Sequence, residues 1–366
     1  MNLAHVVDAN GIPMFSKSYD GNTSDIRMNE DMIEFLTRTV DVRSMILMAD
    51  CKLCTEDILS HLMSSEMSFV TKVPLNFNGR LKEAVIASTR DDIMDESVTR
   101  PGRRYYQTTD TVDGRRVRVI AYILPGAESK AKGFIEGTGL RNAEKKPKSL
   151  KSRRFFCEDD AMDAFRQTIA GLDADCYTAD PVVYKDPAAE KRHGDGKLFR
   201  VRSDNIRIDG SKIRDAVSSH AIQVLITNLP FSDTLSENKR TGASADDVID
   251  LYLEQYKAEA GFKMMKSGMD IANVYIHTPS RISAVAFVVF LATMICKTLD
   301  HVLKETKPPG ERRRTVKVLA DIHMNTIVKY GRRHDRLSVM GNPSATQDAF
   351  ALVDRLDIDP QHLIGY

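Results

Sequence analysis

The chain has 366 residues, enough for two or three domains, and its 42% hydrophobic content fits a folded protein and excludes a disordered tail. Its 52 basic residues nearly balance 51 acidic ones and leave a net charge of +1. Bulk charge therefore gives no argument for a nucleic-acid partner, so such a surface must be sought in local clusters of charge.

The cysteines argue against a disulfide framework, because there are five of them and no signal peptide precedes them. We therefore expect a cytoplasmic protein. The one close pair, Cys51 and Cys54, has no second pair to complete a zinc site, so we interpret all five as ordinary thiols. The longest apolar run, residues 282–295, is shorter than the about 20 residues that cross a bilayer, so we expect a buried core helix and no membrane partner.

The chain opens with a β pattern followed by a helical one. Two strand-like runs, residues 3–8 and 12–19, flank an Asn10-Gly11 pair and predict a β-hairpin. Residues 26–40 then carry apolar side chains at helical spacing.

Asp50 stands at the end of the next predicted strand. Residues 43–50 form a short apolar run without alternation, which is typical of a central strand buried on both faces. A helix beginning near Thr55 and a strand at residues 68–73 follow. Functional sites of α/β proteins lie at the carboxyl ends of strands, so Asp50 is a candidate for chemistry.

The sequence predicts an inserted subdomain in the middle of the chain. Short β-like runs such as residues 117–124 alternate there with charged, Gly-containing stretches, and the α/β pattern resumes with a strand at residues 221–228. We predict four parts: 1–74, the first part of an α/β core; 75–215, an inserted, mostly β subdomain; 216–305, the second part of the core; and 306–366, a basic tail.

A basic stretch within the predicted insertion is the strongest local candidate for phosphate contacts, although runs of this kind are usually solvated loops. Its members are Arg141, Lys145, Lys146, Lys148, Lys151, Arg153 and Arg154.

The helix that begins near Ser244 carries a row of polar side chains. Ser244 and Asp247 have the spacing of a capping box, and the helical pattern continues to about Lys266. At about 100° per residue, four side chains of this helix fall within a sector about 60° wide: Tyr252, Gln255, Glu259 and Lys266. A solvated face stabilised by charged pairs is the alternative interpretation.

The spacing of these four residues resembles the Y-(2)-R-(3)-E-(6)-K signature of insertion-sequence DDE transposases, with Gln255 in place of Arg. Three other segments resemble that family in the same order. They are Gly11–Pro13 followed by Gly21–Asp25, the strand that ends in Ala49–Asp50, and Val274–Ile282 before the apolar helix. The resemblance extends from the first residues to about Asp300.

The resemblance implies an α/β, RNase H-like fold, in which a mixed sheet with flanking helices is interrupted by the insertion. In that family three carboxylates hold two divalent ions, Mg²⁺ or Mn²⁺, which activate the attacking oxygen and stabilise the leaving oxygen of a phosphodiester. Asp50 matches the second Asp and Glu259 the Glu, so both are expected to be catalytic metal ligands.

The resemblance also implies partners and contacts. Tyr252, Gln255, Lys263 and Lys266 are expected to contact DNA near the cleaved end. Gln255 brings no charge, which argues against a bidentate phosphate clamp at that position. The expected partners are double-stranded DNA, at the element ends and the target, and further copies of the chain assembled on that DNA.

The family's first Asp lies on a strand upstream of the hairpin, and no early aspartate of this chain matches it. Asp8, Asp20 and Asp25 are each explained by turns. We therefore expect an N-terminally truncated transposase with an incomplete metal cage, either active in metal-dependent strand cleavage and transfer at insertion-sequence ends or inactive as this chain. The alternatives are a non-catalytic DNA-binding remnant of a transposase, and an unrelated helical protein in which the pattern is a coincidence.

Overall fold

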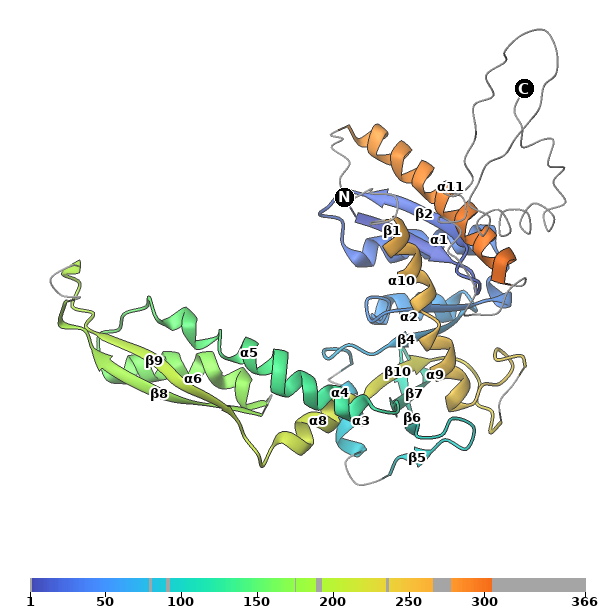
Figure 1. Ribbon diagram of the computed structural model, residues 1–366. Coiled ribbons are helices and arrows are strands. Elements are labelled where there is room, and N and C mark those ends of the chain that lie inside the picture. The colour runs from blue at the N-terminus through green and yellow to red at the C-terminus, as the bar shows by residue number, and fades with distance from the viewer. Residues whose placement is uncertain are drawn as a thin grey trace, which may run out of the picture. The chain divides into compact units, whose positions relative to one another are not determined.

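The computed structural model divides into two compact units (Figure 1). We call residues 1–42 with 251–366 the hairpin unit and residues 43–250 the sheet unit. The structure describes residues 2–78, 81–89, 93–174, 176–188, 193–234, 237–265 and 278–304. Lys266 and the basic tail predicted for residues 306–366 lie outside the described residues.

The hairpin unit confirms the predicted β-hairpin. Strand β1 (Asn2–Val7) pairs antiparallel with β2 (Pro13–Tyr19). The connecting turn is closed by the Asp8 carboxylate, which accepts hydrogen bonds from the backbone N–H groups of Asn10 (2.9 Å) and Ile12 (2.8 Å). Gly11 has φ +80°, which a residue with a side chain rarely adopts.

Two helices of the hairpin unit have an apolar face packed against its strands. Helix α1 (Asp25–Thr39) begins at Ser24, whose hydroxyl accepts from the N–H of Arg27, and its Phe35 ring lies 4.6 Å from Phe15 of β2 between centroids. Helix α11 (Pro279–Lys304) packs against β2. The predicted helix at residues 26–40 is confirmed.

The expectation that residues 282–295 form a buried core helix is wrong in one respect. They are helical, but only one face of α11 is buried, through Ala286, Val289, Thr293 and Cys296, whereas Phe287, Val288 and Ile295 are 55–63% exposed. The helix is also longer than the apolar run. Its residues Ser280–Val302 are long and apolar enough to cross a membrane, and 22% of this stretch is buried. The mostly buried core helix of a soluble protein meets the same test of length and composition.

The sheet unit contains a six-stranded mixed sheet. Strands β3 and β4 are parallel and every other pair is antiparallel, in the order β3-β4-β10-β7-β6-β5. The bounds are β3 Ile46–Ala49, β4 Ser68–Lys72, β5 Asp95–Glu96, β6 Arg104–Val112, β7 Arg115–Ile123 and β10 Gln223–Thr227. A mixed sheet flanked by helices is the architecture expected of an RNase H-like fold.

Strand β3 lies at the edge of this sheet, so its prediction as a central strand buried on both faces is wrong. Within the described residues it pairs only with β4, and of its four side chains only that of Leu47 is buried. A short apolar run does not reveal how many neighbours a strand will have, because pairing is decided by distant segments.

Helices of the sheet unit flank its strands. Helix α2 (Glu56–Ser64) begins after Thr55, as predicted. The Thr55 hydroxyl accepts a hydrogen bond from the N–H of Ile58 and so caps the helix. Helix α3 (Leu81–Ser88) follows β4, and helix α9 (Ala245–Leu253) follows β10.

Between β7 and β10 the chain forms an arm of helices and one hairpin, coloured green to yellow in Figure 1. Strands β8 (Tyr177–Lys185) and β9 (Phe199–Ile208) pair antiparallel, and apolar side chains on one face of this hairpin pack against the helices. The helical segments are α4 Ala127–Phe134, η2 Ile135–Gly139, α5 Leu140–Ala143, η3 Pro147–Leu150, α6 Glu158–Ala174 and α8 Ile213–Ala221.

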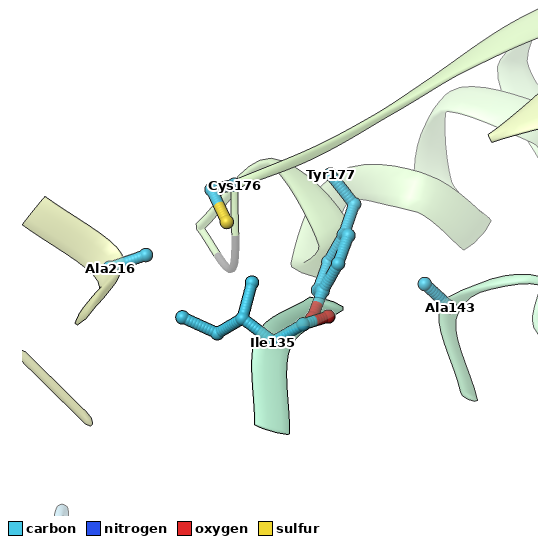
Figure 2. Packing of buried hydrophobic residues seen from close by; sticks show 5 residues of the cluster. All are labelled: Ile135, Ala143, Cys176, Tyr177 and Ala216. Carbon is cyan, nitrogen blue, oxygen red and sulfur yellow. The ribbon is translucent and has the colours of Figure 1, made fainter. Parts of the chain in front are cut away.

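One apolar cluster of the arm joins η2, α5, β8 and α8 (Figure 2). Its members are Ile135, Ala143, Cys176, Tyr177 and Ala216, and the Tyr177 hydroxyl donates a hydrogen bond of 2.9 Å to the Ile135 carbonyl. A Cβ on Gly139 would lie 2.1 Å from that hydroxyl, so only glycine fits there.

The domain boundaries drawn from the sequence remain predictions. The six-stranded sheet takes strands from both sides of residue 75.

A buried ion-pair network holds the start of α9 to the loop before β6. Arg103, 6% exposed, donates to Asp246 (2.8 Å) and Asp250 (2.6 Å). The hydroxyls of Ser97 and Thr99 also donate to Asp246. Burial acts to raise the pKa of Asp246, but these hydrogen bonds outweigh it and hold the pKa below its usual value.

Removing one partner of this network leaves a buried, uncompensated charge. We expect Asp246→Ala to lower the free energy of unfolding by about 3–5 kcal/mol. Far-UV circular dichroism during urea titration measures this, since the chain has no tryptophan. The control is Glu128→Ala, which breaks the exposed ion pair between Glu128 and Arg104. This substitution should lower the free energy of unfolding by under about 1 kcal/mol. Equal losses in the two variants would contradict the assignment.

Candidate active site

Asp50 directly follows strand β3 and is exposed. Its Oδ1 accepts a hydrogen bond of 3.0 Å from the backbone N–H of Lys52, and its backbone carbonyl accepts one of 2.7 Å from the Thr71 hydroxyl on β4. Because β3 and β4 are parallel, Asp50 lies at the edge of the sheet where both strands end. An oriented, solvent-facing carboxylate at such an edge is suited to bind a cation or a substrate.

The predicted capping box at the start of the Glu259 helix is confirmed. The Ser244 hydroxyl accepts from the N–H of Asp247 (3.1 Å), and the Asp247 carboxylate accepts from the N–H of Ser244 (3.0 Å).

The prediction of one helix running on to about Lys266 is wrong. Helix α9 ends at Leu253, and a second helix, α10 (Tyr256–Lys263), begins after Gln255. Between them the N–H groups of Glu254 and Gln255 bond to carbonyls three residues earlier, so this turn is wound more tightly than an α-helix. The angular register that placed Tyr252 and Glu259 on one narrow face is therefore changed.

Helix α10 brings three of the predicted site residues onto one face. Gln255 is its N-cap, and Glu259 and Lys263 follow at intervals of four residues, which places them one above another on the helix surface. Glu259 and Lys263 are exposed and Gln255 is partly exposed. Tyr252 belongs to α9.

The β1–β2 hairpin holds α10 in place. The Lys257 ammonium donates a hydrogen bond of 2.6 Å to the carbonyl of Ala9 in the hairpin turn and forms an ion pair of 3.0 Å with Glu254. One helical turn further on, the Phe262 ring lies 5.1 Å from the His5 ring of β1 between centroids, in an edge-on arrangement. The position of the helix that carries Glu259 therefore depends on the hairpin.

His5 sits in the closest part of this contact. A Cβ on Gly261 would lie 2.9 Å from His5 Nε2, so β1 approaches α10 only because residue 261 is glycine. His5 is 8% exposed, and neither of its ring nitrogens has a hydrogen-bond partner in the described residues. Burial, with a smaller effect of Lys297, lowers the pKa of His5 to about 4.

Residues 1–295 match the family model of the transposase DDE domain. The chain belongs to this family. It is a DNA transposase, a class of enzyme that acts on DNA with divalent metal ions. No similar protein was found among the curated proteins compared.

The transposase presents its two candidate metal ligands from different units. Asp50 belongs to the sheet unit and Glu259 to the hairpin unit. Both are exposed carboxylates, the ligand type that hard divalent cations prefer. The described residues contain no group of three His, Cys, Asp or Glu side chains arranged to hold a metal ion.

Sequence patterns missed the residues that support α10. Lys257, Gly261 and His5 belong to no motif, and their contacts join segments more than 240 positions apart in sequence. Gly261 was the one available signal, because a glycine inside a helical pattern often marks a place where another segment packs closely against the helix.

Adding a methyl group at residue 261 tests this packing. Gly261→Ala places Cβ against His5, so we expect unfolding to become easier by about 1–3 kcal/mol. Combining it with His5→Ala, which opens space, should recover part of that loss, as a double-mutant cycle measures. Gly133→Ala on α4 is the control, since its Cβ would meet nothing within 4 Å and alanine favours helix. If the effects of Gly261→Ala and His5→Ala on the free energy of unfolding simply add, the two residues do not interact as described.

The buried His5 also makes stability depend on pH. The pKa of His5 is about 4 in the folded protein and 6.5 in the unfolded chain. Between these values the unfolded chain binds a proton that the folded protein does not, so stability is full above pH 6.5 and falls as the pH drops toward 4. At pH 5 the loss should be on the order of 2 kcal/mol. Urea unfolding at pH 7 and pH 5 measures it, with His5→Leu as the comparison. An equally steep pH dependence in that variant would rule out His5 as the cause.

Proposed function

We propose that this transposase cleaves and transfers DNA strands at the ends of an insertion sequence, in the cytoplasm, with Mg²⁺ or Mn²⁺ held by Asp50 and Glu259. The observation that carries the proposal is the family membership, together with two exposed carboxylates at the positions that resemble the family's second Asp and its Glu. When bound, such ions activate the attacking oxygen and neutralise charge on the phosphodiester.

The protein's own residues orient the groups that meet DNA. The hairpin, through Lys257 and His5, holds α10 and with it the backbone of Glu259. Lys263 follows Glu259 by one helical turn and supplies a positive charge beside the carboxylate, where a phosphate of the cleaved strand would lie. We assign the same role to Lys266.

Tyr252 and Gln255 are proposed to donate neutral hydrogen bonds to the DNA backbone. A phenol hydroxyl and an amide each place one donor on a phosphate oxygen but add no charge. They therefore position the DNA end, whereas the lysines supply most of the salt-dependent affinity.

The basic stretch from Arg141 to Arg154 is proposed to contact DNA phosphates away from the cleaved bond. It spans α5, η3 and the loop before α6, and most of its side chains are exposed. Arg154 is the exception, because it is paired with Asp195 at 2.8 Å. Several copies of the chain are proposed to assemble on the DNA, since the two ends of an element must be brought together.

The decisive test replaces Glu259 by glutamine, which keeps its shape and removes its charge. With supercoiled plasmid carrying the DNA that flanks the gene, and Mg²⁺ or Mn²⁺, we expect wild type to nick and Glu259→Gln to lose nicking by about a thousandfold while binding the same DNA. The control is Glu34→Gln, an exposed carboxylate on α1 of the same unit. DNA binding without metal-dependent nicking by wild type would instead identify a non-catalytic DNA-binding protein.

A further inference from the structure

Two of the cysteines lie in one tight turn directly after Asp50. The backbone N–H of Cys54 donates a hydrogen bond to the carbonyl of Cys51, with N and O 3.2 Å apart. A turn closed in this way keeps its first and fourth Cα atoms within about 7 Å, and a disulfide needs about 4.4–6.8 Å between Cα atoms. The turn therefore holds both residues near the separation that a disulfide requires.

The two thiols differ in access. Cys51 is partly exposed, whereas Cys54 is 2% exposed and stands beside the fully buried Leu53. A dissolved oxidant therefore reaches Cys51 first, and Cys54 lies close by as the second thiol. Burial, with a smaller effect of Cys51, raises the pKa of Cys54 to about 12, so the Cys54 thiol attacks the oxidised sulfur slowly. Cys157 is also exposed, but no second cysteine lies near it in the sequence.

The same turn orients the Asp50 carboxylate. The N–H of Lys52, a residue between the two cysteines, donates to Asp50 Oδ1 at 3.0 Å, and the N–H of Leu53 donates to the Asp50 carbonyl at 3.2 Å. Joining Cys51 to Cys54 closes a ring that contains both of these donors. Ring closure therefore adds a covalent constraint to the backbone segment that supplies both donors to Asp50.

We propose that Cys51 and Cys54 form a reversible disulfide site, oxidised by hydroperoxides, whose closure displaces Asp50. The effect on Asp50 rests on the proposed function, whereas disulfide formation does not.

The chemistry has two balanced steps. The hydroperoxide transfers one oxygen to the Cys51 sulfur, which becomes a sulfenic acid, and the peroxide is reduced to water or an alcohol. The Cys54 sulfur then attacks the Cys51 sulfur, the S–S bond forms as the S–O bond breaks, and the hydroxyl leaves as water with the Cys54 proton. Because the closed loop is short, it gains little from loop closure, so a dithiol reductant reopens it.

Peptide mapping of the full chain tests the site directly. Reduced protein is treated with dilute hydrogen peroxide, and the remaining thiols are alkylated. The protein is then digested with a protease, and the peptide masses are measured by mass spectrometry. We expect a peptide containing both Cys51 and Cys54 that is lighter by two hydrogen atoms and returns to its alkylated mass after dithiothreitol. In Cys54→Ser, Cys51 should stop at the sulfenic acid, which a cyclic diketone traps. The proposal fails if both thiols stay alkylatable while Cys157 is oxidised.

Plasmid nicking tests the link to Asp50. Oxidation should lower wild-type nicking by roughly tenfold to a hundredfold, with recovery in dithiothreitol, because small displacements of a catalytic group cost that much. A Cys51→Ser, Cys54→Ser double variant should nick equally before and after peroxide. Unchanged nicking in a protein whose disulfide has formed overturns control of Asp50. Absence of nicking even in reduced wild type counts against the proposed function instead, and the peptide map still decides the site.

Discussion

The contact between the β1–β2 hairpin and helix α10 holds the helix that carries Glu259. It has a polar part, in which Lys257 reaches the Ala9 carbonyl, and an apolar part, in which His5 lies against Gly261 and Phe262. Neither part touches the carboxylate. Glu259 is exposed, and the backbone of its helix is held by Lys257 and Gly261, which lie about 200° around the helix from it.

The two halves of the broken helix are anchored by different means. Helix α9 is held by Arg103, whose guanidinium lies between two carboxylates in a buried setting where losing one partner is expensive. Helix α10 is held by one lysine and by close packing around a glycine. The tightly wound turn between them comes just after the point at which the chain leaves the sheet unit.

Charge acts locally in this molecule, because the net charge of +1 gives no long-range attraction for DNA. Under the proposed function, lysines on the Glu259 helix and the basic stretch of the arm supply the local charge instead. The buried arginines Arg103 and Arg118 instead donate hydrogen bonds within the protein. Arg118, for example, donates to the carbonyls of Leu229, Pro230 and Ala243 and to the Gln107 side chain, so it ties strand β7 to the segment after β10.

The sequence by itself determined the local elements and the family. The hairpin, the helices α1 and α2, the capping box of α9, and the candidate residues Asp50 and Glu259 depend on turn residues, a cap and spacing, which are short-range signals. Only tertiary structure decided that β3 is an edge strand, that α11 buries one face, and that the Glu259 helix breaks after Leu253. These features depend on which distant segments pack together, as His5 packs against Gly261. The periodicity of one stretch of chain does not show which other segments will contact it.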